Sequence, residues 1–113
     1  VEDLPPVPYV GSDEDWEARV AKTKTGRPLV VDFTATWCGP CRMIGPKFEE
    51  FSLSYTDLLF VKVDVDDCDS VAAAAGISAM PTFQVYKAGQ KVDELVGASP
   101  EKLEALIKAA LTK

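Results

Sequence analysis

An almost unbroken apolar run at residues 29–33 ends five residues before a pair of cysteines, Cys38 and Cys41. A Val-rich run of this kind is typical of a central strand that is covered on both faces. The residues that follow predict a helix from Cys38 towards Tyr55, with Pro46 inside it. Both cysteines are therefore expected where a buried strand meets the first turn of a helix.

The rest of the chain predicts strands that alternate with helices. This alternation, with a hairpin late in the chain, indicates an α/β domain. We expect a central mixed, mostly parallel β-sheet of about five strands flanked by about four helices. Residues 1–10, rich in proline and acid, are predicted to form an N-terminal arm, and residues 11–113 a single domain. The further expected elements are a helix capped by Ser12, a strand at 58–65, a short helix at 67–75, strands at 82–87 and 91–96, and a helix capped by Ser99.

Composition excludes several classes of function. The 113 residues contain no histidine, which removes His-based catalytic triads and the common His-containing zinc sites. The net charge of −6 argues against nucleic acid or an anionic membrane as the main partner. Three cysteines are too few for a disulfide-rich secreted scaffold, and one of them is left unpaired.

The Cys38-Gly39-Pro40-Cys41 motif points to thiol chemistry. Two cysteines three positions apart on a first helical turn face the same way and can close a small disulfide ring. The positive end of a helix stabilises a thiolate, which is the nucleophilic form of cysteine. Two alternative interpretations of this motif stay open: that it is half of a zinc site, and that it forms a purely structural disulfide. Zinc would need two more ligands, and only Cys68 remains.

Four segments together resemble the thioredoxin family. They are residues 31–41 (VDFTATWCGPC), residues 62–66 (KVDVD), residues 80–83 (MPTF) and Gly97, in family order and at family spacing. The variant around residues 34–36 is most similar to eukaryotic cytosolic members, especially the plant and algal h-type. The resemblance implies the thioredoxin fold over roughly residues 28–113.

The resemblance also implies roles for individual residues. Cys38 is the expected nucleophile and Cys41 the resolving cysteine, paired in a Cys38–Cys41 disulfide. Asp32 is an acid within an apolar strand, where burial should raise its pKa; by resemblance it relays a proton for Cys41. Lys62 is implied as the charge partner of Asp32.

A substrate-docking surface beside the cysteines is implied as well. The family has a cis peptide bond before the residue that matches Pro81, facing the disulfide. The expected docking residues are Trp37, Gly39, Pro40, Met80, Pro81, Gly97 and Ala98.

Cys68 is expected to be either a small buried hydrophobe or a regulatory thiol, and its acidic neighbours should disfavour its thiolate.

The function so implied is protein-disulfide reduction that contributes to cell redox homeostasis. It needs no bound cofactor or metal, and an NADPH-dependent flavoprotein thioredoxin reductase supplies the electrons. We expect a cytoplasmic monomer, with an organelle as the alternative location, whose partners are this reductase and disulfide-containing target proteins. A disulfide oxidase or isomerase is one alternative, although those relatives usually carry His where this chain has Pro40. A non-catalytic binding module is the other.

Overall fold

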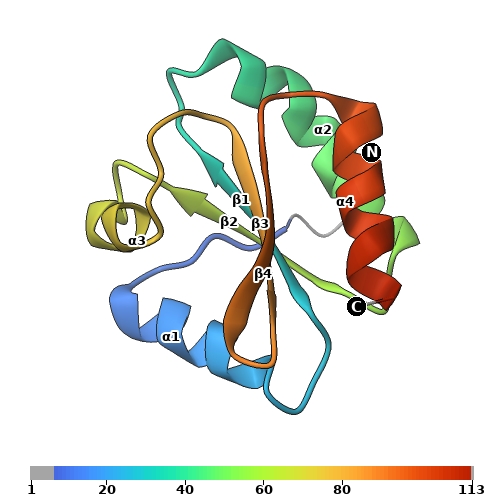
Figure 1. Ribbon diagram of the computed structural model, residues 1–113. Coiled ribbons are helices and arrows are strands. Elements are labelled where there is room, and N and C mark those ends of the chain that lie inside the picture. Colours follow the sequence, from blue (N-terminus) through green and yellow to red (C-terminus); the bar gives the residue numbers. More distant parts are fainter. Residues whose placement is uncertain (1–6, 113) are drawn as a thin grey trace.

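A four-stranded sheet lies between two pairs of helices in the computed structural model, which describes residues 7–112 (Figure 1). The strand order is β2-β1-β3-β4. Within the described range no helix is both long and apolar enough to cross a bilayer. In chain order the elements are α1 (Asp13–Lys22), β1 (Leu29–Thr34), α2 (Gly39–Ser54), β2 (Leu59–Asp64), α3 (Asp69–Ala74), β3 (Thr82–Lys87), β4 (Gln90–Val96) and α4 (Pro100–Thr112).

The expected α/β architecture with a mixed sheet and four helices is confirmed, but two details were wrong. Among residues 7–112 the sheet has four strands rather than five. It is also not mostly parallel: β1 pairs with β2 in parallel, but the β1–β3 and β3–β4 pairings are antiparallel. A strand–helix–strand alternation suggests parallel crossovers, whereas the connection through α3 brings β3 to the opposite side of β1 and reverses its direction.

The described part of the N-terminal arm explains the missing strand. The Lys62 N–H donates to the Pro8 carbonyl at 2.9 Å, and the Val10 N–H donates to the Lys62 carbonyl at 2.8 Å. Because proline has no N–H, the pairing stays an isolated parallel bridge between Tyr9 and Lys62. Residues 1–6 of the predicted arm lie outside the described residues.

The two faces of the sheet bury separate apolar clusters. Val30 and Phe60 belong to one cluster, and Val31 and Val61 belong to the other. The first cluster includes residues of α2 and α4, which lie on one side of the sheet, and the second includes residues of α1 and α3, which lie on the opposite side (Figure 1). Side chains alternate between faces along a strand. Asp32 therefore lies on the α2 side.

We expect Ser12→Ala to cost about 1 kcal/mol of stability, because it removes the N-cap of α1. The Ser12 hydroxyl accepts a hydrogen bond from the Asp15 N–H at 3.0 Å. Chemical denaturation of both proteins measures the loss. Ser54→Ala, at the exposed end of α2, is the control; an equal loss in both variants would contradict a capping role.

Candidate active site

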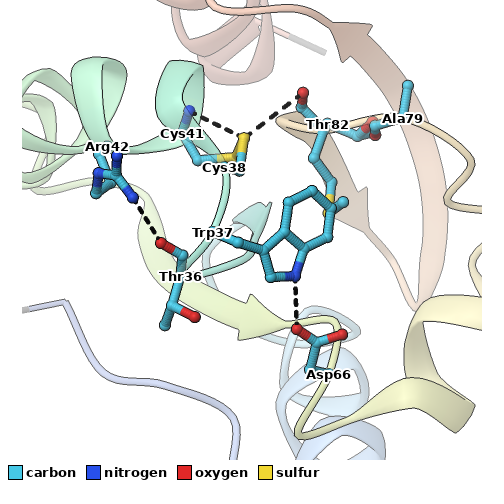
Figure 2. Close-up of a disulfide and its surroundings, with 9 residues drawn as sticks. Thr36, Trp37, Cys38, Cys41, Arg42, Asp66, Ala79 and Thr82 are labelled. Atoms are coloured by element: carbon cyan, nitrogen blue, oxygen red, sulfur yellow. Dashed lines mark hydrogen bonds between the residues drawn. A yellow bond between two sulfur atoms is a disulfide. The ribbon is translucent and has the colours of Figure 1, made fainter.

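Cys38 and Cys41 form a disulfide at the start of α2 (Figure 2). Their Cα atoms are 5.2 Å apart, an ordinary separation for a disulfide. Cys38 has extended backbone angles (φ −91°, ψ 112°) and is the N-cap of the helix, which begins one residue later than predicted. Gly39 and Pro40 form the first helical positions, where the missing N–H of proline costs no helical hydrogen bond.

The backbone around Cys38 favours negative charge on its sulfur. Cys38 Sγ accepts a hydrogen bond from the Cys41 N–H at 3.2 Å. The first turn of α2 contains no acidic residue, so nothing within it opposes the positive end of the helix dipole. A thiolate at this position is therefore stabilised.

Trp37 and Met80 flank the disulfide. Trp37 is 63% exposed, and its Nε1 donates a hydrogen bond to Asp66 Oδ2 at 2.8 Å. The carbonyl oxygen of Met80 lies 3.9 Å from Cys38 Sγ. Cys38 itself is only 6% exposed, so a partner has to reach its sulfur between these neighbours.

The peptide bond between Met80 and Pro81 is cis. The Pro81 carbonyl accepts a hydrogen bond from the Gly97 N–H at 2.9 Å, which joins this turn to the end of β4. Gly97 has φ +116°, a conformation that residues with a Cβ rarely adopt. Gly97 and the following Ala98 are thereby held beside the cis turn.

Asp32 is a buried acid of β1. It is 1% exposed, and its Oδ1 has no hydrogen-bond partner among the described residues. Burial raises the pKa of Asp32 from its ordinary 3.8 to about 7; Lys62 opposes this rise and Glu49 adds to it. Asp32, Cys41, Glu49 and Lys62 all line one groove of about 1210 Å³ along α2.

Lys62 lies beside Asp32 in the sheet register, but its ammonium makes a direct ion pair with another acid. Lys62 Nζ is 2.5 Å from Glu49 Oε2. Sequence reasoning missed Glu49. Its spacing of eight residues from Cys41 puts both on one face of α2, and that spacing was the available signal.

Comparisons with known proteins agree with this geometry. Residues 7–109 match the family model described as Thioredoxin. The chain belongs to the thioredoxin family. It is 58% identical over 100 residues to "Thioredoxin H-type" of Chlamydomonas reinhardtii, covering 87% of this chain and 88% of that protein. It is 52% identical over 105 residues to "Thioredoxin-1" of Schizosaccharomyces pombe, covering 93% and 99%. The X-ray structure of Fasciola hepatica thioredoxin superimposes with a TM-score of 0.87 at 40% identity, covering 92% and 99%.

Family membership gives the chemistry of the cysteine pair. Thioredoxins are disulfide oxidoreductases that work without a bound cofactor, and this chain carries the pair as the Cys38–Cys41 disulfide. The predicted thiol–disulfide exchange is therefore the activity of this thioredoxin-family chain.

Cys68 lies apart from the cysteine pair, in the cluster beneath α1 and α3. It is a free, buried cysteine whose Sγ donates to the Val10 carbonyl at 3.4 Å. Burial raises the pKa of this thiol, and the carboxylates of Asp67, Asp13, Asp64 and Asp15 raise it further. The redox chemistry of this family member thus centres on the other two cysteines.

Proposed function

We propose that Cys38 attacks target disulfides and that Cys41 completes their reduction. The supporting observation is the position of Cys38 at the N-cap of α2, where its sulfur accepts the Cys41 N–H. The Cys38 thiolate forms a bond to one target sulfur, and the other target sulfur leaves as a thiolate. Cys41 then attacks Cys38 and expels the first target sulfur. Two electrons pass to the target, and Cys38 and Cys41 end as a disulfide.

Asp32 takes the proton from Cys41 before this second attack. A general base works best when its pKa lies near the working pH, and the pKa of Asp32 is about 7. Its carboxylate shares the groove with Cys41, and its Oδ1 has no other hydrogen-bond partner within the described range. Together these properties support a proton relay that acts on the resolving cysteine.

The target binds as an extended segment across the cis turn. The Met80 carbonyl beside Cys38 offers a backbone acceptor to such a segment, and Pro81 brings no competing N–H. Exposed Trp37 adds an apolar contact at the edge. The docking surface that we propose consists of Trp37, Gly39, Pro40, Met80, Pro81, Gly97 and Ala98.

The electron donor in this proposal is an NADPH-dependent flavoprotein thioredoxin reductase, and the partners are disulfide-containing proteins. The chain acts as a monomer in the cytoplasm. A free thiol in addition to the redox pair fits a compartment that keeps cysteines reduced.

We expect Cys41→Ser to accumulate covalent adducts with a disulfide target such as insulin, because the mixed disulfide on Cys38 then has no resolving thiol. Non-reducing electrophoresis with mass spectrometry detects them. The double variant Cys38→Ser/Cys41→Ser should form none. Adducts that persist in the double variant, or none with Cys41→Ser, would assign the attack to another residue.

A further inference from the structure

Glu49 joins three parts of the fold behind the disulfide. It lies on α2, its Oε2 pairs with Lys62 Nζ of β2 at 2.5 Å, and its Oε1 accepts the Val7 N–H at 2.8 Å. The Tyr9 ring covers the same ammonium, with Lys62 Nζ 5.6 Å from the ring centroid. Only 15% of the Lys62 side chain is exposed, so this charge is held in place by the arm and the helix.

The carboxylate nearest to Lys62 in the sheet register is nevertheless not its ion-pair partner. Asp32 and Lys62 are in register on adjacent parallel strands, and their side chains project from the same face. Asp32 Oδ1 has no hydrogen-bond partner among residues 7–112, while the ammonium is bound by Glu49. Two acids thus lie near Lys62, Asp32 on β1 and Glu49 on α2, and the ammonium is bound to the one on the helix.

The charges that face Asp32 come from two elements. Lys62 of β2 favours its ionised form, and Glu49 of α2 opposes it. Its β3 neighbour, Phe83, carries no charge. The remaining charged or titratable groups that line the groove are Tyr9, Arg42, Lys47, Glu50 and Asp64, among which Lys47 and Glu50 pair with each other at 2.9 Å.

We propose that Glu49 is a positioning residue for the resolving step: it holds the Lys62 ammonium off Asp32 and thereby sets the pH at which Asp32 accepts the Cys41 proton. This inference rests on the relay role proposed for Asp32. It adds that α2, the helix that carries the resolving Cys41, also carries Glu49, which controls the proton affinity of Asp32. The arm takes part, since Val7 and Tyr9 contact the same ion pair.

The test follows the carboxyl ¹³C signal of Asp32 through a pH titration of the oxidised protein. Glu49→Gln removes the negative charge but keeps an acceptor for the Val7 N–H. We expect the proton affinity of Asp32 to fall at least about tenfold, because the released ammonium then turns to Asp32. Glu50→Gln, one residue along the same helix, should leave the titration unchanged. An unchanged titration in Glu49→Gln, or an equal shift in Glu50→Gln, overturns the proposal.

A second comparison separates positioning from the direct effect of the Glu49 charge. In a Lys62→Met background no ammonium is available to move, so Glu49→Gln should lower the proton affinity of Asp32 by less than in the wild type. Equal effects in both backgrounds overturn the positioning role. Thermal unfolding of each variant identifies any that fail to fold, and Glu49→Asp then serves as the milder substitution.

The rate of the resolving step links the titration to function. In Glu49→Gln the midpoint of the pH profile of the resolving step should move to lower pH by as much as the titration midpoint of Asp32 does. If the titration of Asp32 shifts but the pH profile of the resolving step does not, the proposal is overturned. Asp32→Asn tests the underlying relay separately: if its pH profile equals that of the wild type, the relay fails, whatever the titration of Asp32 reports about Glu49.

Discussion

Cys38→Ser is expected to abolish reduction of insulin disulfides, with turnover falling at least about 1,000-fold. A serine hydroxyl stays protonated at neutral pH, so the helix terminus has no anion to stabilise. Cys41 is 3% exposed and lies inside the first turn rather than at the N-cap, so we expect it not to replace Cys38 as the attacking sulfur. The measurement is insulin turbidity with dithiothreitol or a reductase as electron donor.

Cys68→Ser is the matched control, since it removes the same thiol from a buried site apart from the cysteine pair. We expect it to keep wild-type turnover. If Cys38→Ser kept substantial turnover, or if Cys68→Ser lost it, the attacking sulfur would have to be reassigned.

The cysteine pair could be predicted from sequence because its geometry is local. The hydrogen bond from the Cys41 N–H to Cys38 Sγ spans three residues, and the helix dipole follows from the helix itself. Burial of Asp32 followed from its apolar neighbours in β1. Each of these features depends on residues close together in the chain, which periodicity and spacing describe well.

The partners of the site residues depend on tertiary structure and were not predictable in the same way. Glu49 meets Lys62 only because α2 packs over β2, and Asp66 reaches Trp37 across 29 positions of sequence. The family resemblance implied Lys62 as the charge partner of Asp32, its neighbour in the sheet, and did not point to Glu49 as the ion-pair partner.

The predicted helix at residues 67–75 begins later than expected for a local reason. Asp64 Oδ1 accepts the N–H groups of Asp66 and Asp67 at 2.9 and 3.2 Å. A side chain that binds the backbone in this way stabilises a turn in competition with a helix. The helix α3 therefore starts at Asp69.

Asp32→Asn should change how stability depends on pH more than any other single substitution in the buried core. Folding raises the pKa of Asp32 from 3.8 to about 7, so the folded state binds the proton more tightly than the unfolded chain does. The contribution of Asp32 to wild-type stability is thus largest below about pH 4 and declines until about pH 7, by roughly 4 kcal/mol in total. Asparagine does not titrate, so this decline should disappear.

Urea unfolding of the oxidised proteins at about pH 4 and about pH 8 measures the effect. The stability difference between Asp32→Asn and the wild type should move in favour of the variant by roughly 4 kcal/mol between the two conditions. Asp57→Asn is the control, because Asp57 is exposed and should leave the wild-type decline intact. A decline of the same size in Asp32→Asn would mean that another group titrates, and that Asp32 is not a base poised near neutrality. Its proposed part in the resolving step would then lose its physical basis, because an acid that is already fully ionised well below neutral pH has little affinity for the Cys41 proton.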